Sequence, residues 1–327
     1  MTVVDIHTHM FGHTWLEMLH KYGAPSYSAG TMSDGRDYLM EKGAPACALE
    51  EEAFDYGARI AAMDKHGIDI AVVSLTSPNV YWGGEEVSSE TARLVNDEMA
   101  QGQVLYPDRI RWLASLPFEY PNKAIDELHR SIEKGAVGVM VTASINGKHL
   151  IDPLFDPIWS EINKLALPVL VHPTAPFGAK EADFGIERIL MPGAGFMFDT
   201  TLGIARMAVN GFFERFSDLN IIASHGGGYL PYVNGRIDMF FKVETLVKQK
   251  INKLPSEYLG RIYYDAVLYD PGALALCIDI AGYEKVLFGT DFPMPCDIPQ
   301  LYEIIGSRSP EEEKAIKGQN AIKLFGL

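Results

Sequence analysis

The stretch VVDIHTH, residues 3–9, is an apolar run that ends in two histidines one residue apart. In a β-strand, residues i and i+2 point to the same face, so His7 and His9 would lie side by side. Two neighbouring imidazoles in a packed core each need hydrogen-bond partners, unless they share a cation. By itself the stretch is compatible with a pair of buried, hydrogen-bonded histidines and with a metal site.

Seven further short apolar runs follow this stretch, and most are separated by segments with helical patterning. Continuous apolar runs are typical of parallel strands covered on both faces, and strand–helix alternation indicates βαβ units. Eight such units predict an α/β fold, a distorted (β/α)8 TIM barrel. A doubly wound open sheet is the competing fold, but no GxGxxG turn follows the first run. The strand candidates span residues 3–6, 68–75, 110–116, 136–141, 168–173, 220–225, 261–266 and 286–291.

The chain of 327 residues is expected to form one barrel domain over 1–327. Barrels of this class commonly reach this length as a single unit. Between the first strand and the first clear helical segment, Gly, Pro, Ser and charged residues are mixed without a period. We therefore expect an irregular insertion at about 10–53, after the first strand.

Composition limits the partners and the compartment. The net charge of −15 argues against binding to nucleic acid, whose phosphates require a basic surface. Cys47, Cys277 and Cys296 are odd in number and form no CxxC pair, which fits a reducing compartment. Neither a signal-peptide pattern nor a run of about 18 apolar residues is present. We expect a cytoplasmic protein with no membrane or nucleic-acid partner.

Polar side chains gather at the carboxyl ends of the strand candidates, where TIM barrels place their chemistry. His7 and His9 end the first run, His172 ends the fifth, His225 the sixth, and Asp291 the eighth. Three imidazoles and one carboxylate suit zinc, which also leaves a position for water in catalytic sites. Asp291 could bind the metal, hold the water, or do both. His225 could be a fourth imidazole ligand or a base.

Four motifs at these positions resemble the amidohydrolase superfamily. They are DIHTHMF (5–11), VLVHP (169–173), HGGGYLPYVNGRID (225–238) and FGTDFP (288–293). Within that superfamily they are similar to the decarboxylase branch that contains α-amino-β-carboxymuconate-ε-semialdehyde decarboxylase and γ-resorcylate decarboxylase. Segments 210–221 and 255–274 are similar to the same branch, so the resemblance runs over most of the chain.

The resemblance implies one divalent metal per subunit, usually zinc, with Mn²⁺ and Co²⁺ as alternatives. It implies His7, His9, His172 and Asp291 as metal ligands. It also implies His225 as the acid/base beside a metal-bound water, with Asp291 sharing in catalysis. Many members of the superfamily carry a lysine at the end of strand four that bridges two metals. Here that strand reads VGVMVTA, without a lysine, which fits the branch with one metal.

The resemblance also implies a homodimer. Arg236 matches an arginine that, in this branch, reaches the neighbouring subunit's site and holds the substrate carboxylate. A bidentate guanidinium suits that task. The alternative is a surface arginine in a local ion pair.

Two positions depart from the family pattern. Counting back from Arg59 places Cys47 where the semialdehyde decarboxylase has a second carboxylate-binding arginine, and Arg36 is the candidate replacement. Gly193 stands where that enzyme has a tryptophan. A missing charge and a missing ring indicate a different substrate.

Taken together, these residues predict a zinc-dependent, non-oxidative decarboxylase, that is, a carboxy-lyase. The expected substrate is a small unsaturated or aromatic carboxylate, such as a muconate semialdehyde or a hydroxybenzoate. The alternative is a metal-dependent hydrolase or hydratase of a related carboxylate or lactone, because the same ligand set serves both chemistries. A binding protein with a vestigial barrel would have lost some of the five polar residues, and all five are present.

Overall fold

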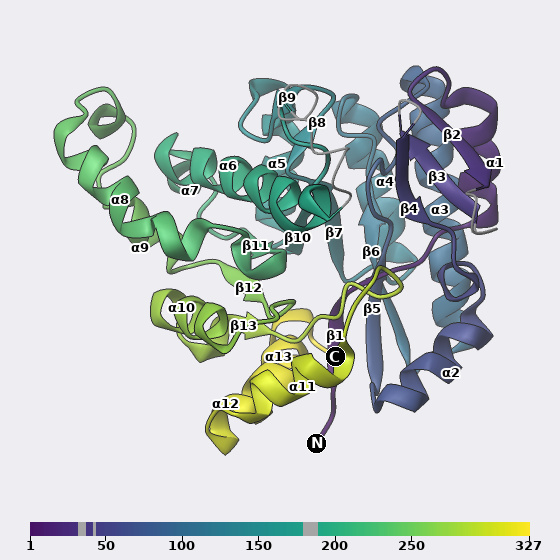
Figure 1. Cartoon of the computed structure of the whole chain (residues 1–327). Helices are drawn as coiled ribbons and strands as arrows, with labels where there is room; N and C mark the ends of the chain where they lie inside the picture. The colour runs from purple at the N-terminus through teal and green to yellow at the C-terminus, as the bar shows by residue number, and fades with distance from the viewer. Residues whose placement is uncertain (32–36, 42–43, 179–188) are drawn as a thin grey trace.

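The computed structural model describes residues 1–31, 37–41, 44–178 and 189–327 (Figure 1). Eight parallel strands form one sheet in the order β1-β5-β6-β7-β10-β11-β12-β13, a nearly closed TIM-like barrel. All eight predicted strands are therefore confirmed. Their bounds are β1 (Val4–His9), β5 (Ile70–Ser74), β6 (Ile110–Ser115), β7 (Gly138–Thr142), β10 (Pro168–His172), β11 (Asn220–Ala223), β12 (Tyr263–Asp265) and β13 (Val286–Leu287).

The barrel closes between its first and last strands through a few separate backbone contacts rather than a regular ladder. Ile6 N donates to Phe288 O at 3.0 Å, and His9 N donates to Phe292 O at 2.7 Å. A parallel bridge joins Thr8 to Phe292 beyond the end of β13. We call this junction the seam. It brings the carboxyl end of β1 beside the segment that carries Asp291.

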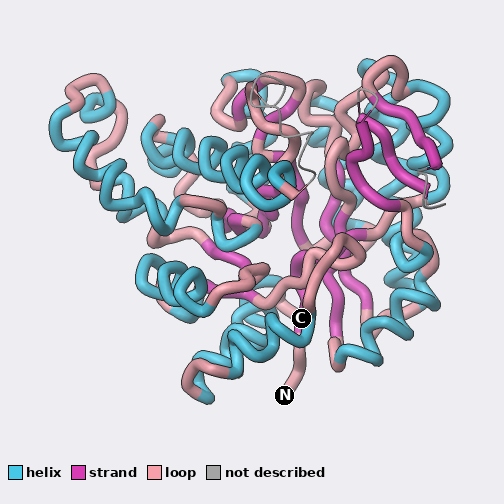
Figure 2. Tube along the Cα trace, in the orientation of Figure 1, coloured by secondary structure: helices cyan, strands magenta, loops and turns pink. Residues whose placement is uncertain are grey.

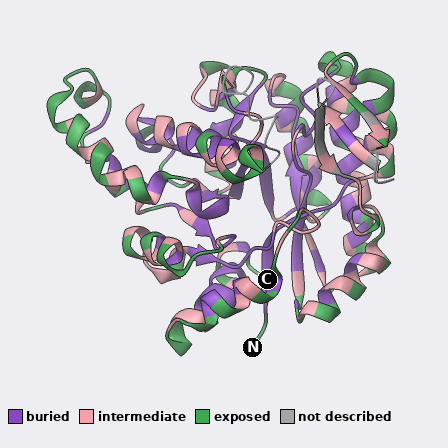
Figure 3. Ribbon diagram, in the orientation of Figure 1, coloured by how far each residue is buried: buried purple, intermediate pink, exposed green. Residues whose placement is uncertain are grey.

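Helices surround the strands, and the strands form the buried centre of the molecule (Figure 3). The barrel interior is filled by an apolar layer of Val4, Ile6, Val72, Leu113, Met140, Leu170, Ile222 and Leu287. The helices are α1 (His13–Tyr22), α2 (Tyr56–His66), α3 (Gly84–Leu105), α4 (Pro121–Glu133), α5 (Asp156–Lys164), α6 (Phe196–Val209), α7 (Phe212–Arg215), α8 (Leu230–Val243), α9 (Pro255–Leu259), α10 (Pro271–Ala281), α11 (Ile298–Gly306), α12 (Pro310–Lys314) and α13 (Asn320–Phe325).

The segment 10–53, expected to be irregular, contains α1 and a small antiparallel sheet (Figure 2). The sheet has the order β2-β3-β4, with β2 (Tyr27–Thr31), β3 (Asp37–Glu41) and β4 (Ala44–Ala48). Its strands hold few β-branched residues and show little alternation, so their pairing leaves a weak pattern in the sequence. A second, two-stranded hairpin of β8 (Ser144–Ile145) and β9 (Lys148–His149) follows β7.

Among the described residues, every helix is too short or too polar to cross a bilayer.

Candidate metal centre

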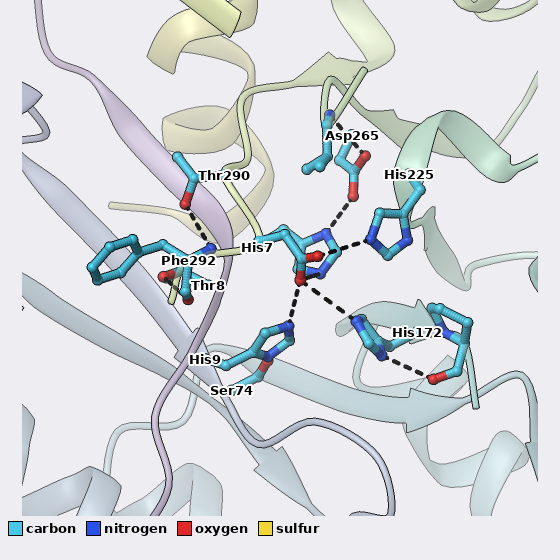
Figure 4. Close-up of polar contacts among 12 residues, drawn as sticks. His7, Thr8, His9, Ser74, His172, His225, Asp265, Thr290 and Phe292 are labelled. Carbon is cyan, nitrogen blue, oxygen red and sulfur yellow. Dashed lines mark hydrogen bonds and ion pairs between the residues drawn. The ribbon is translucent and has the colours of Figure 1, made fainter. Parts of the chain in front are cut away.

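The five residues predicted from strand ends converge at one place (Figure 4). His7 and His9 lie on β1 two residues apart, and His172 is the last residue of β10. His225 and Asp291 follow β11 and β13 within a few residues. Residues from four parallel strands thus meet because parallel strands all end at the same rim of a barrel.

The Asp291 carboxylate is at the centre of the cluster, and four imidazoles surround it. Its Oδ1 lies 3.0 Å from Nε2 of His9, 3.3 Å from Nε2 of His7 and 3.9 Å from Nε2 of His172. Its Oδ2 lies 3.2 Å from Nε2 of His225. Single ligand atoms of His7, His172, His225 and Asp291 all lie within 4.8 Å of one another, the spacing of a metal site. His9 contacts the same carboxylate but is not part of that four-residue group.

Three of the imidazoles are oriented through the nitrogen that faces away from Asp291. A partner on the Nδ1 nitrogen fixes the ring and leaves Nε2 free for a metal, an arrangement common to metal-binding histidines. The three contacts are His7 Nδ1 to Asp265 Oδ2 at 2.6 Å, His9 Nδ1 to Ser74 Oγ at 3.3 Å, and His172 Nδ1 to Pro173 O at 3.0 Å.

Several buried nitrogens in the cluster have no hydrogen bond. Nε2 of His7 and of His172 are buried and make none among the described residues, although both face Asp291. Buried polar atoms without partners are rare in native proteins. A divalent metal would satisfy them together, and nitrogen and oxygen donors are the ligands that zinc and manganese accept. The donor set therefore fits a divalent metal ion.

His225 differs from the other three rings. Its Nδ1 is buried and makes no hydrogen bond among the described residues, and its contact with the cluster runs through Nε2, which lies 3.2 Å from Asp291 Oδ2.

The ionisation of the cluster favours a cation. Burial disfavours the charge on Asp291, yet the surrounding imidazoles hold its pKa well below its usual range. Burial lowers the pKa of His9, and lowers that of His172 to about 3, so both rings stay neutral. Burial also opposes protonation of His7, but the carboxylates of Asp265 and Asp291 raise its pKa to about 10. A metal entering the site would displace that proton.

Unusual backbone conformations aim two of these side chains. Asp291 has φ 64° and His225 has φ 52°, both in the left-handed region that residues other than glycine seldom adopt. Gly228, in the HGGG turn after His225, has φ 63°, and an added Cβ would lie 2.2 Å from Met197 O. Left-handed residues cost on the order of 1–3 kcal/mol each and cluster at functional sites.

Asp265 is a site residue that the sequence reasoning missed. It is fully buried at the end of β12, and its Oδ2 pairs with His7 Nδ1. Its Oδ1 accepts Gly226 N at 3.0 Å and Val267 N at 3.1 Å, so it also holds the turn after His225. The signal was available, because Asp265 is the last residue but one of the seventh predicted strand, 261–266, close to the same rim as the predicted ligands.

Arg236 is not brought to the cluster of its own subunit. It is exposed on α8, which extends away from the barrel (Figure 1). Its guanidinium lies 5.0 Å from the centre of the Phe240 ring. In the described part of the chain it makes no ion pair, so the alternative of a local ion pair finds no support.

Neither of the two positions that depart from the family pattern carries a charge. Cys47 lies half-buried on β4 as a free thiol. Arg36 lies outside the described residues. Gly193 is exposed, and an added Cβ would meet nothing within 4 Å.

Fold and site together define a TIM-barrel enzyme with a divalent metal site at the carboxyl ends of its strands. Comparison with known proteins narrows this class. Residues 4–327 match the model of the family described as "Amidohydrolase". The chain therefore belongs to the amidohydrolase family.

Curated relatives place it within that family. It is 31% identical over 333 residues to 2-amino-3-carboxymuconate-6-semialdehyde decarboxylase of Dictyostelium discoideum, covering 99% of this chain and 91% of the relative. It is 29% identical over 311 residues to γ-resorcylate decarboxylase of a Polaromonas species, covering 91% and 95%. The chain groups with the metal-dependent, non-oxidative decarboxylases of the family.

Solved structures share the fold over the whole chain. Metarhizium anisopliae IDCase in its apo form superposes with a TM-score of 0.89 at 26% identity, covering 99% of this chain and 97% of that one. The dihydroxybenzoic acid decarboxylase of a Polaromonas species superposes with a TM-score of 0.81 at 24% identity, covering 100% and 97%. That structure holds manganese and the inhibitor 2-nitroresorcinol.

Proposed function

We propose that this enzyme removes a carboxyl group, without oxidation, from a small unsaturated or aromatic carboxylate. Candidate substrates are a hydroxybenzoate and an amino-carboxymuconate semialdehyde, the classes on which its relatives act. The observation that carries the proposal is the convergence of four imidazoles on one partly buried carboxylate at the barrel rim. Because the curated relatives are decarboxylases, decarboxylation is favoured over the hydrolase and hydratase alternatives.

The metal we propose is zinc, one ion per subunit, with Mn²⁺ and Co²⁺ as alternatives. His7, His9, His172 and Asp291 would hold it, because each of these three rings has a fixed Nδ1 partner and an Nε2 directed at Asp291. When bound, such an ion polarises substrate oxygens and lowers the pKa of a bound water. Metal analysis of the purified protein, by mass spectrometry of the digested sample, would identify it.

We assign His225 the transfer of the proton. Decarboxylation breaks the bond between the carboxyl carbon and its neighbour, releases carbon dioxide and leaves an electron pair that a proton must take up. The Nε2 of His225 lies 3.2 Å from Asp291 Oδ2, and the side chains of His225 and Asp291 are 10% and 19% exposed. Solvent and substrate can thus reach both, whereas His7 and His9 are sealed from solvent.

The test of the reaction is direct. Purified enzyme supplied with Zn²⁺ or Mn²⁺ should release carbon dioxide from one or more members of a panel of hydroxybenzoates and unsaturated dicarboxylates. A matched panel of lactones and amides tests the hydrolase alternative. Turnover confined to the second panel would refute the proposal.

A pair of variants tests the role of His225. His225→Ala should abolish turnover yet keep the metal, because the proposed ligand set does not include it. His7→Ala, the matched control in the same cluster, should lose the metal. Loss of metal from both variants would make His225 a ligand, in agreement with the four-residue group His7, His172, His225 and Asp291.

We also propose a homodimer in which Arg236 binds the substrate carboxylate in the partner's site. The outer face of α8 supports a contact with a second copy, since apolar side chains around Arg236 are exposed, Tyr232 at 83%. They are Tyr232, Met239, Phe240 and Val243. Light scattering should give the mass of a dimer. In a dimer that combines an Arg236→Ala subunit with a His225→Ala subunit, only the site with both intact residues should turn over.

The cytoplasm is our prediction for location. Cys47, Cys277 and Cys296 are all free thiols, as a reducing compartment favours. Cell fractionation with an antibody to the native protein would test it.

A further inference from the structure

Arg59 is a buried cation that no step of the proposed reaction uses. It lies on α2 and is 1% exposed. Its Nη1 donates to Thr8 Oγ1 at 2.7 Å and lies 3.5 Å from Phe292 O. Its Nη2 donates to His9 O. The guanidinium carbon lies 4.6 Å from the centre of the Phe292 ring.

These partners all belong to the seam. Thr8 and His9 come from the carboxyl end of β1, and Phe292 directly follows Asp291. None of the ion pairs in the described ranges includes Arg59. Its direct contacts are oxygens of the seam and an aromatic face, while the buried carboxylate of Asp5 attracts its charge from farther away. Buried arginines are rare unless paired, which points to a specific role for this one.

Among the described strands of the barrel, β1 and β13 are the neighbours that no regular ladder joins, although Asp291 N donates to His7 O at 2.7 Å. β13 ends at Leu287, before the chain reaches Asp291, so no regular ladder fixes the segment around Asp291. Asp291 also holds a left-handed backbone conformation, with φ 64°. Such a conformation persists only when its surroundings enforce it. Phe292 O accepts His9 N at 2.7 Å and Thr8 Oγ1 at 2.9 Å, and Arg59 reinforces both bonds from outside.

We propose that Arg59 is a positioning residue that locks the seam and thereby sets the spacing between His9 and Asp291 in the metal site. The inference rests on the proposed function, since it assigns Arg59 to the same metal site. The role proposed for Arg59 is to position the site and not to bind substrate, because Arg59 is buried and contacts the backbone of His9 instead of its ring.

The test compares substitutions at Arg59 with the same substitution at the other end of the barrel. Arg59→Met keeps an unbranched, largely apolar side chain and removes every hydrogen bond. Arg59→Lys keeps the charge and a single donor nitrogen. Arg109→Met is the control. Arg109 also ties segments together, through Asp69 O at 2.7 Å, Ile68 O at 3.0 Å and Asp64 Oδ1 at 2.7 Å, but next to the start of β6.

The main readout is metal affinity, measured by competition with a chelator well below the melting temperature, without substrate. Loss of an outer partner of a metal ligand costs about 10–100-fold in affinity. Arg59→Met should fall in that range, Arg59→Lys should recover part of the loss, and Arg109→Met should match the wild type. The visible spectrum of the Co²⁺-loaded protein should change in Arg59→Met and not in Arg109→Met, since it reports ligand geometry rather than stability.

Thr8→Val keeps the inference testable if Arg59→Met does not fold. Valine has the shape of threonine, and the change removes the hydroxyl that joins Arg59 to Phe292 O. It should weaken metal binding measurably, but by less than the about 10–100-fold that the loss of a whole outer partner costs. The inference would be overturned if a folded Arg59→Met kept wild-type metal affinity and an unchanged Co²⁺ spectrum. If Arg59→Met is unfolded, the same result in Thr8→Val would overturn it. Either result would leave the proposed function intact. Wild-type protein that binds no metal would overturn the proposed function itself.

Discussion

Asp265→Asn is the substitution whose effect can be worked out most fully from the structure. Asp265 and His7 are both fully buried, and His7 Nδ1 donates to Asp265 Oδ2 across 2.6 Å. An asparagine has the same shape, but one of its terminal atoms is an amide nitrogen, which donates and cannot accept. The oxygen must stay where Oδ1 now accepts Gly226 N and Val267 N, because two buried amides without partners would cost about 1–3 kcal/mol each.

The amide nitrogen of the variant would therefore face His7 Nδ1. Two donors cannot share one hydrogen bond, so His7 Nδ1 would have to accept from the amide, and the single proton of the neutral ring would lie on Nε2, the atom directed at Asp291. A protonated Nε2 cannot bind a metal. Losing the partner that orients a metal-binding histidine lowers affinity about 10–100-fold. At about 1.4 kcal/mol per tenfold, the loss is about 1.4–2.8 kcal/mol of binding free energy.

The assay is competition for Zn²⁺ between the protein and a chelator of known affinity at neutral pH. Asp270→Asn is the matched control, because Asp270 caps α10 from an exposed position and asparagine caps helices equally well. Asp270→Asn should bind zinc like the wild type. If folded Asp265→Asn also keeps wild-type affinity, then the Asp265 contact does not orient His7 and the reasoning fails.

The raised pKa values of His7 and Asp199 and the close packing at Gly289 each predict a measurable effect. Zinc affinity should rise by up to about tenfold per pH unit near neutrality, because the pKa of His7 is raised to about 10 and metal entry displaces its proton; a flat profile would contradict this. Asp199→Asn should raise the melting temperature above about pH 6 but not near pH 4. Burial raises the pKa of Asp199 from 3.8 to about 6, so the folded protein binds a proton there more tightly than the unfolded chain and loses stability as the pH rises from about 4 to 6. Equal melting temperatures of variant and wild type above pH 6 would refute this. Gly289→Ala should lower stability by about 1–3 kcal/mol in denaturant titrations, since its Cβ would lie 2.8 Å from His7 Cβ, and it should also weaken metal binding in the chelator assay. At Gly193 an added Cβ meets open space, so Gly193→Ala should match the wild type in both measurements.

The barrel and the cluster were predictable because both depend on strong, local patterns. Each barrel strand is a short apolar run, and the end of a parallel strand fixes the rim on which its last side chains lie. His7, His9, His172, His225 and Asp291 stand at such ends, so their convergence could be expected from order along the chain alone.

Other features left no comparable signal. Arg59 was visible only as a helix residue, because its partners are a backbone carbonyl, a hydroxyl and a ring whose positions depend on barrel closure. The small sheet after β1 is held by backbone pairing with little side-chain alternation. Arg236 makes no contact with the cluster of its own chain, so its proposed role depends on a second copy that one sequence cannot place.

Asp291 and His225 hold left-handed backbone conformations, which glycine adopts without steric cost. Glycine at either position would relax the main chain while removing the carboxylate or the ring. A mutant library screened only for heat resistance should therefore enrich inactive enzymes altered at these two codons. Engineering campaigns on this scaffold would need to select for turnover in every round.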